Sequence, residues 1–362
     1  MQNFSNILIF HPAAIGDAVL ATPVASTLKA NFPGAKITYW SHNSLRPLLL
    51  GLCPHVDDFI DFDKGMGYFE LRKILNDARP DLFVDLSNSS RGKLLPLFSR
   101  TAVARYEKKA DTGPGQQHAV GNFLEAIAPF CPDLPKDVFP TLFPDAIAEE
   151  LVPQLVAGNK LSLRPLIGIV PGVGAFRPHR AWIPDGWTYL IRHIMQMDTH
   201  IPVLIGGSDD FETAQRIAAE FGDKVLNLCG QLKLDETAAI LKCCDVVLSG
   251  DTGPAHIAVA VGTPVIGLYG PTYPARSGPY GYFNLVIDQS SSCQCIGERF
   301  CKIGNPNNPG ECMNRIMLTE VIGRLHEVLG SLEQELPEEA GVLVDPAVLA
   351  ELEQFKRTDS QS

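Results

Sequence analysis

The sequence constrains its fold most strongly through an alternation of short apolar runs with longer helix-like segments, which occurs twice along the chain. The apolar runs are almost continuously hydrophobic, as residues 6–10 (NILIF) and 166–170 (LIGIV) illustrate. Such strands are typical of parallel sheets, because helices cover both faces of the sheet. We therefore expect an α/β protein with two doubly wound parallel sheets. The other expected strands are residues 36–40, 58–62, 82–86, 202–205, 225–228, 246–248 and 264–268.

A proline-rich stretch at residues 131–164 separates the two alternating runs and favours a connection between two domains. We predict Rossmann-like domains at residues 1–155 and 156–330 that face each other across a cleft, followed by an acidic tail at residues 331–362. The tail holds eight acidic and two basic residues and contributes −6 of the formal net charge of −11. Ligands of such sheets bind beyond the carboxyl ends of the strands, so the loops that follow strands are the informative ones.

The charge balance excludes one class of function. The chain has 30 Lys and Arg against 41 Asp and Glu, whereas electrostatic binding of nucleic acid needs a basic surface. The N-terminal segment lacks the basic region of a signal peptide, and a long uncharged stretch, residues 256–274, is interrupted by glycine and proline. We therefore expect a cytoplasmic protein without a membrane span.

The loop after the first expected strand carries Gly16 and Asp17 at the start of a helix. One interpretation is that Asp17 is the N-cap of that helix, a position for which Asp is well suited. The other is that Asp17 presents a carboxylate to the cleft as a general base. The loop does not contain the GxGxxG pattern of dinucleotide-binding proteins, which weakens the case for a dehydrogenase.

A second loop, residues 249–256 (SGDTGPAH), lies between an apolar strand and a helix. Its glycines allow a ligand to approach the backbone closely, and the amides at a helix start, together with the Thr252 hydroxyl, suit a diphosphate. Asp251 would repel phosphate, so we assign it to the loop itself or to a sugar hydroxyl. His256 falls one turn into the helix and could face the same anion, with a buried core histidine as the alternative.

Two further loops of the second domain carry charged residues. The first contains Arg177, His179 and Arg180 after a glycine turn, and such a group is suited to a pyrophosphate unless it is simply an exposed basic loop. The second contains Asp210, which could accept hydrogen bonds from a ribose or cap the next helix.

The nine cysteines are too few for a disulfide scaffold, but four of them fall within a stretch of 20 residues. This spacing lacks the paired CxxC pattern of most zinc sites, so a structural metal and reduced or redox-labile thiols are both open. The four residues are Cys293, Cys295, Cys301 and Cys312.

Taken together, these loops resemble the heptosyltransferases of glycosyltransferase family 9. The similarity covers roughly residues 5–330 and is carried by an opening segment, residues 7–40, and by the block at residues 246–281, VVLSGDTGPAHIAVAVGTPVIGLYGPTYPARSGPYG. Between them the segments LIGIVPGVG, HRAWIP and VLIGGSDDFETAQRIA occur in the family's order. The resemblance implies a GT-B fold, with an acceptor-binding N-terminal domain and a C-terminal domain that binds a nucleotide sugar.

The resemblance also implies an activity. Members transfer heptose from ADP-heptose to the inner core of lipopolysaccharide, with inversion and without a catalytic metal or other cofactor. The partners would be a nucleotide sugar and an anionic glycolipid or glycan acceptor, whose lipid could bring the enzyme to the cytoplasmic face of the inner membrane. Relatives that glycosylate autotransporters carry a four-cysteine iron site, but the spacing here is shorter, so the resemblance does not extend to that metal.

By position, the resemblance gives Asp17 the role of general base and Asp251 that of binding the heptose. Arg180 falls where the family usually has a phosphate-binding Lys, which changes the point charge to a planar fork. Tyr273 stands where the family usually has Asp after YGPT. The remaining expected donor contacts are Thr252, Gly253 and His256 with the diphosphate, Asp210 with the ribose and Leu232 with the adenine. The expected acceptor contacts, by loop position only, are Lys93, Arg100 and Arg105.

Two other functions stay open on the sequence alone. A sugar-nucleotide epimerase on the same fold would consume its substrate without an acceptor. A nucleotide-binding scaffold that has lost catalysis would bind ADP but transfer nothing.

Overall fold

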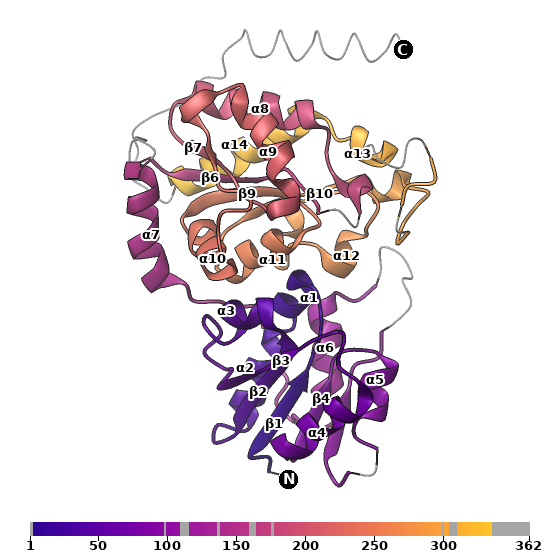
Figure 1. Cartoon of the computed structure of the whole chain (residues 1–362). Coiled ribbons are helices and arrows are strands. Elements are labelled where there is room, and N and C mark those ends of the chain that lie inside the picture. Colours follow the sequence, from indigo (N-terminus) through magenta and orange to yellow (C-terminus); the bar gives the residue numbers. More distant parts are fainter. Residues whose placement is uncertain are drawn as a thin grey trace.

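The structure is a computed structural model, and it describes residues 3–334 except 98, 109–115, 136–137, 159–163, 175–176, 299 and 304–309. It contains two α/β domains, one above the other in Figure 1. The predicted acidic tail lies outside the described residues apart from its first four, which end the last helix. None of the helices in the described part of the chain has the length and apolar character needed to span a bilayer.

The N-terminal domain is built on a five-stranded parallel sheet with the order β3-β2-β1-β4-β5. Side chains of the central strand alternate between two faces, as a strand requires. Leu8 and Phe10 pack with α4 on one face, whereas Ile7 and Ile9 pack with α1, α2 and α6 on the other. The strands are β1 Asn6–Phe10, β2 Lys36–His42, β3 Asp58–Phe62, β4 Leu82–Asp85 and β5 Ala102–Arg105.

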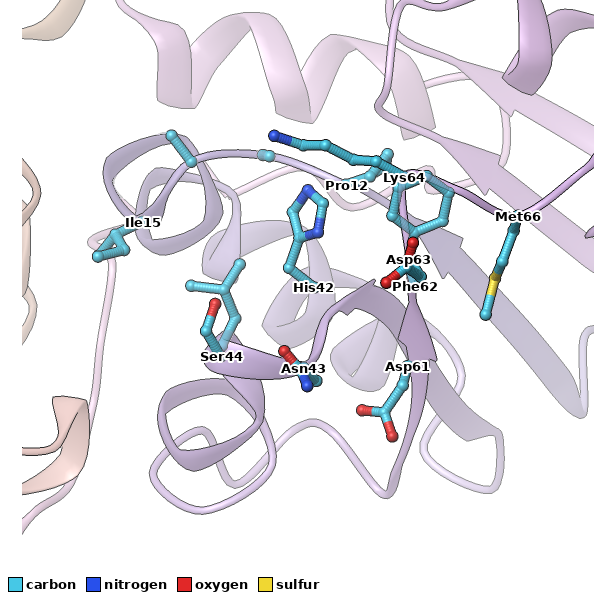
Figure 2. Close-up of a pocket in the computed structure, with 13 residues that line it drawn as sticks. Pro12, Ile15, His42, Asn43, Ser44, Asp61, Phe62, Asp63, Lys64 and Met66 are labelled. Atoms are coloured by element: carbon cyan, nitrogen blue, oxygen red, sulfur yellow. The ribbon is translucent and has the colours of Figure 1, made fainter. Parts of the chain in front are cut away.

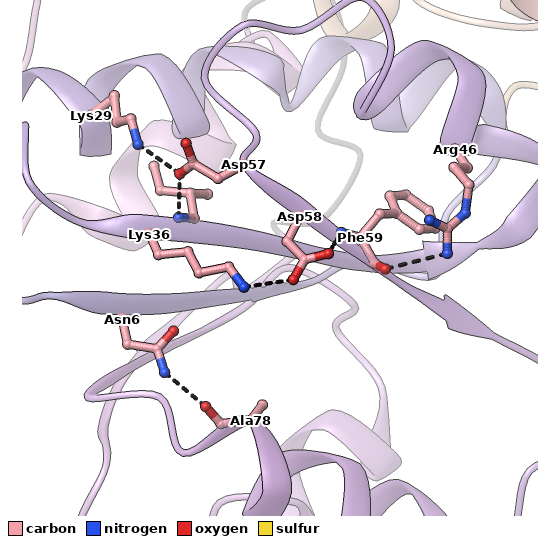
Figure 3. Close-up of polar contacts among 9 residues, drawn as sticks. Asn6, Lys29, Lys36, Arg46, Asp57, Asp58, Phe59 and Ala78 are labelled. Carbon is pink, nitrogen blue, oxygen red and sulfur yellow. Dashed lines mark hydrogen bonds and ion pairs between the residues drawn. The ribbon is translucent and has the colours of Figure 1, made fainter.

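Ion pairs and hydrogen bonds link α2 and β2 to the start of the edge strand β3 (Figure 3). Lys29 of α2 contacts Asp57, and Lys36 at the start of β2 contacts Asp58, each at 2.6 Å. These pairs are largely exposed, so each contributes only about 0 to 1 kcal/mol. The hydrophobic core therefore holds the domain together.

The C-terminal domain has a six-stranded parallel sheet with the order β11-β10-β9-β6-β7-β8. Alternate residues again face opposite layers: Ile167 and Ile169 pack with α8, α9 and α14, whereas Leu166 and Val170 pack on the side of α10 and α11. The strands are β6 Leu166–Val170, β7 Ile201–Leu204, β8 Leu226–Asn227, β9 Cys244–Gly250, β10 Val265–Tyr269 and β11 Ile287–Asp288.

Helices account for most of the remaining chain. In the N-terminal half they are α1 Ile15–Leu20, α2 Thr22–Asn31, α3 Arg46–Leu49, α4 Tyr68–Ala78, α5 Ser90–Leu94, α6 Ala119–Ile127 and α7 Asp145–Gly158. In the C-terminal half they are α8 Pro184–Met197, α9 Phe211–Ala219, α10 Leu234–Lys242, α11 Gly253–Ala260, α12 Pro274–Ser277, α13 Glu311–Asn314 and α14 Leu318–Gln334.

One buried apolar cluster runs through both domains, because α1 packs against α11 and α3 packs against α10. The carboxyl ends of both sets of strands point toward this junction, where α1 and α11 face each other in Figure 1. A closely packed junction fixes the loops of the two domains relative to each other, which is what a shared site needs.

Three details differ from the sequence-based expectations. Residues 18–31, whose spacing of apolar residues predicts one helix, fall in two helices, with Pro23 in the first turn of the second, where its missing amide costs nothing. Strand β5 was not expected, because AVAR is short and Val103 is its only large apolar side chain. The proline-rich connection contains α7, which includes Pro153, spans the predicted boundary at residue 155 and packs against α10.

Candidate functional site

The loop after β1 and the loop after β9 touch across the domain junction. A Cβ on Gly16 would lie 2.6 Å from Cδ2 of His256, and a Cβ on Gly253 would lie 3.0 Å from Cβ of Ile15. Larger residues would force these loops apart, so each glycine permits the close approach of the two domains. The loops that the sequence analysis selected from opposite domains therefore lie side by side.

Asp17 lies in the first turn of α1, but it is not the N-cap. Ala14 occupies the N-cap position, and no side chain caps the helix, so the capping interpretation of Asp17 was wrong. The Asp17 side chain is exposed. Burial raises the pKa of Tyr106 in the same domain, and the negative charge of Asp17 adds to that rise. The same charge opposes the lowering of the pKa of Arg177 in the C-terminal domain. Asp17 is thus an accessible carboxylate near charged groups of the other domain.

The loop after β9 leads into α11 through Thr252, which is the N-cap residue. The Thr252 hydroxyl contacts Ser249 Oγ at 2.8 Å and does not cap the helix. The first amides of a helix have no acceptor within the helix and carry a partial positive charge. The start of α11, beginning at Gly253, therefore has uncapped backbone amides, and an anion such as a phosphate could accept hydrogen bonds from them.

Asp251 in the same loop is almost buried and forms an ion pair with Arg180, with 2.6 Å between Oδ2 and Nη1. Burial by itself raises the pKa of Asp251, but the neighbouring His256 side chain and the positive charge of Arg180 outweigh it and bring the pKa down to about 2. His256 Nε2 lies 3.8 Å from Asp251 Oδ1. Both Asp251 and Arg180 are therefore held in fixed positions as ions.

His256 is 4% exposed, and its Nδ1 has no hydrogen-bond partner among the described residues. The ring is sandwiched between Asp251 and Gly16. Buried imidazoles without a partner at one nitrogen are uncommon, because the lost hydrogen bond with water destabilises the folded state. His256 therefore occupies the buried core position, and its contact with an anion stays a prediction.

Arg276, which the sequence analysis overlooked, belongs to the same charged group. Arg276 in α12 lies close enough to Arg177 to help lower its pKa, although burial and Arg180 contribute more. Arg177 also feels Asp251 and Asp17, which act in the opposite direction. Three guanidinium groups thus gather where the two domains meet. Arg276 lies inside the block that carries the family resemblance, and its position between YGPT and SGPYG was the available signal.

Two other predicted donor residues, Asp210 and Leu232, lie on loops of the C-terminal domain. The Asp210 carboxylate accepts hydrogen bonds from the amides of Gly207, at 3.0 Å, and Gly174, at 3.2 Å. It therefore links the loops after β6 and β7, and in this arrangement it stabilises the loops themselves. Leu232 is half-buried, just before α10, and packs on the core that spans the two domains.

The three predicted acceptor residues lie on or near α5 and β5, at the β5 edge of the N-terminal sheet. Lys93 and Arg100 are exposed. Arg105 lies 3.4 Å from the fully buried carboxylate of Asp85, which also accepts a hydrogen bond from Ser87. A buried carboxylate requires such partners, so Arg105 has a structural task in addition to any contact with a ligand.

A cavity of about 630 Å³ opens at the carboxyl ends of β1, β2 and β3, beside the start of α1. In Figure 2, His42 points toward the Lys64 side chain, while Asp61, Asn43 and Ser44 lie below. Burial, followed by the charge of Lys64, lowers the pKa of His42. The mixture of polar groups with Pro12, Ile15, Phe62 and Met66 is suited to a sugar, which presents both hydroxyls and apolar faces.

The four cysteines after β11 are all unpaired thiols and lie close together. Cys295 Sγ is 3.8 Å from Cys301 Sγ, and Cys312 is hydrogen-bonded to Cys293. Burial raises the pKa of Cys312 to about 12. Within the described ranges, no three His, Cys, Asp or Glu side chains are arranged so that they could hold a metal ion.

Comparison with known proteins fits these features. The model of glycosyltransferase family 9 (heptosyltransferase) matches residues 96–303, which is more than half of the chain. The lipopolysaccharide heptosyltransferase 2 of Escherichia coli K12 is 27% identical over 310 residues, or 78% of this chain and 87% of that protein.

Solved structures show the same fold. The ADP-heptose lipopolysaccharide heptosyltransferase II of E. coli superposes with a TM-score of 0.72 and 24% identity, covering 91% of this chain and 99% of that one. A family 9 glycosyl transferase from Veillonella parvula gives a TM-score of 0.74 with 19% identity, covering 91% and 98%. The predicted fold, two parallel-sheet domains of the GT-B type, is confirmed.

Proposed function

This chain belongs to glycosyltransferase family 9 and is a glycosyltransferase, and on that premise we propose that it moves a heptose from ADP-heptose to a lipopolysaccharide inner-core or related glycan acceptor. The observation that carries this proposal is the close approach of the loop that bears Gly16 and Asp17 to His256, beside the buried ion pair of Arg180 with Asp251, at the domain junction. One side offers a proton acceptor, and the other offers positive charge for a leaving diphosphate.

We propose that the C-terminal domain holds the donor by its diphosphate. As the bond between the anomeric carbon and the phosphate oxygen breaks, its electron pair stays on that oxygen and negative charge grows there. The uncapped amides of α11 and the fixed guanidinium of Arg180 can stabilise this charge without a metal ion. Asp251, which is ionised and held by Arg180, would accept hydrogen bonds from the sugar hydroxyls.

The acceptor hydroxyl attacks the anomeric carbon from the face opposite the diphosphate, and the sugar configuration inverts. Its proton passes to the Asp17 carboxylate, which is accessible at the junction. No cofactor takes part in this scheme. We assign the acceptor sugar to the cavity beside Ile15, with Lys64 on its wall, and anionic groups of the acceptor to Lys93 and Arg100.

The donor is tested by a thermal-shift panel of ADP, UDP, GDP and CMP. A nucleotide that binds only the folded protein raises the midpoint of unfolding, by an amount that grows with its concentration relative to Kd. We expect ADP to raise it most. If UDP or GDP raises it more than ADP does, the nucleotide of the donor is assigned wrongly.

The reaction is tested by incubating the enzyme and ADP-heptose with and without a heptose-free core acceptor. We expect ADP to be released only when the acceptor is present. Consumption of ADP-heptose without an acceptor would indicate an epimerase, and binding of ADP without any transfer would indicate a scaffold.

A structural metal on the four cysteines stays a prediction of the sequence, since the thiols here do not surround a single position. Elemental analysis of protein purified under reducing conditions decides it. About one equivalent of zinc or iron, lost when Cys295 is replaced by Ser, would establish the metal. A metal-free protein with full activity would assign the cluster to reduced thiols.

A further inference from the structure

Helices α4 and α5 of the N-terminal domain form a continuous surface patch, of which the proposed function uses only Lys93 and the neighbouring Arg100. The Tyr68 hydroxyl donates to the carbonyl of Leu94 at 3.3 Å, and the Arg72 guanidinium donates to the carbonyl of Leu95. These contacts fix the two helices side by side, as seen in the N-terminal domain of Figure 1. The side chains that project outward from them therefore form one face.

This face exposes unusually many large apolar side chains. Phe69 is 86% exposed, Leu94 47%, Leu97 45% and Tyr68 39%. The Tyr68 and Phe69 rings are 5.7 Å apart in an edge-on arrangement. Single exposed apolar residues are normal, but a contiguous group of them on a folded domain marks a surface that meets another apolar phase.

Basic side chains surround the apolar group. Lys73 lies one helical turn after Phe69 and is exposed, as are Arg91, Lys93 and Arg100. Between residues 86 and 106 the sequence holds four basic residues and no acidic one, although the whole chain carries a net charge of −11. A run of basic residues without an intervening acidic one therefore lies beside Phe69, the most exposed large apolar side chain of the described residues.

The nearby acidic residues weaken this charge only in part. Asp85 is fully buried with Arg105, and Asp81 accepts hydrogen bonds from the amides of Ser5 and Asn6 at the far end of the strands. Glu70 is exposed in the first turn of α4. Asp77, four residues after Lys73, is the other exposed acidic residue of α4, so Lys73, Arg91, Lys93 and Arg100 outnumber the acidic residues of α4 by four to two.

We propose that the α4–α5 face binds the surface of a lipid bilayer that contains anionic lipids. Aromatic and leucine side chains enter the boundary between head groups and acyl chains, while Lys and Arg pair with lipid phosphates. The charge complementarity favours an anionic bilayer over a protein partner of unspecified charge. The face consists of Tyr68, Phe69, Lys73, Arg91, Lys93, Leu94, Leu97 and Arg100.

The position of the face gives the contact a purpose. Arg91 donates from Nη1 to the backbone carbonyl of Lys64 at 3.1 Å, and Lys64 and Met66 line the 630 Å³ cavity. An enzyme docked through α4 and α5 would hold the mouth of this cavity near the head groups, where the sugars of a lipid-linked acceptor lie. Only this purpose rests on the proposed function, because the binding itself rests on the surface chemistry.

The test is cosedimentation of the full chain with vesicles of phosphatidylcholine alone or mixed in equal parts with phosphatidylglycerol. We expect binding to the mixed vesicles that weakens as salt is raised, and little binding to phosphatidylcholine. Replacing Phe69 and Leu97 by Ser should lower the bound fraction about tenfold, since their burial supplies the apolar part of the affinity. Lys73→Glu should also weaken binding.

The matched controls are Phe211→Ser and Lys224→Glu, which change an exposed aromatic and an exposed base of the C-terminal domain and should leave vesicle binding unchanged. Circular dichroism and transfer to a deacylated, water-soluble acceptor should be the same for the Phe69→Ser, Leu97→Ser variant and the parent. This second assay separates failure of the docking surface from failure of the proposed activity. Equal binding to both vesicle types, no binding to either, or undiminished binding of the variant would overturn the proposal.

Discussion

The two sides of the domain junction differ in how they hold their charges. On the C-terminal side, Asp251 and Arg180 are mostly buried, ion-paired at 2.6 Å and fixed before any ligand arrives. On the N-terminal side, Asp17 is exposed beside an open cavity whose wall carries Lys64. Fixed, buried charges are suited to a diphosphate, whose shape is constant. An open surface is suited to a large acceptor and to a base that must exchange its proton.

The largest expected effect concerns the open side. Replacing Asp17 by Asn keeps the size of the side chain but removes the proton acceptor, so we expect transfer to fall by at least about 10²-fold. The side chain is exposed, so the free energy of unfolding should change by less than about 0.5 kcal/mol. Calorimetry should show ADP binding within a few fold of the parent. Turnover at the parental rate would remove Asp17 from the mechanism.

The next effect concerns the buried side. Arg180→Met leaves the Asp251 carboxylate buried without its partner, so we expect a loss of about 3 kcal/mol in the free energy of unfolding, measured with urea. ADP affinity should fall as well, because the proposed contact of Arg180 with a phosphate is lost. The control is Arg192→Met, which breaks an exposed pair with Glu220 and should cost less than about 1 kcal/mol. Equal losses in both variants would contradict the contrast between the two sides.

A smaller effect concerns the seam between the domains. His118 caps α6 by accepting from the amide of Val120 at Nδ1, and its Nε2 donates to the Gly278 carbonyl of the other domain at 3.1 Å. Burial lowers its pKa from 6.5 to about 4, and protonation at Nδ1 would remove the cap. The neutral ring therefore stabilises the folded state above pH 6.5, and this contribution is lost as the pH falls toward about 4.

The measurement for this effect is the free energy of unfolding from urea titrations between pH 7 and pH 4. Replacing His118 by Gln should reduce the loss of unfolding free energy between pH 7 and pH 4 by about 2 kcal/mol. His11 and His193 have their pKa lowered to about 4 in the same way and contribute to the slope of both proteins. An identical slope in parent and variant would show that His118 does not sense pH.

The sequence predicted the elements that packing makes nearly obligatory. The apolar runs at residues 6–10 and 166–170 became central strands, because only burial on both faces suits them. Strand β5 escaped notice because an edge strand needs fewer apolar residues. The capping role considered for Asp17 failed because the chain entered α1 three residues earlier, at Ala14. Helix boundaries depend on small local differences, which tertiary contacts readily override.

What the sequence by itself determined is the architecture and the set of loops that carry polar groups, because hydrophobic periodicity and glycine placement are local properties of the chain. What only the tertiary structure decided is the pairing within and between those loops. It pairs Arg180 with Asp251, packs His256 against Gly16 and brings Arg276 of α12 close to Arg177. These contacts join residues that are far apart along the chain, and the packing of one domain against the other sets their geometry.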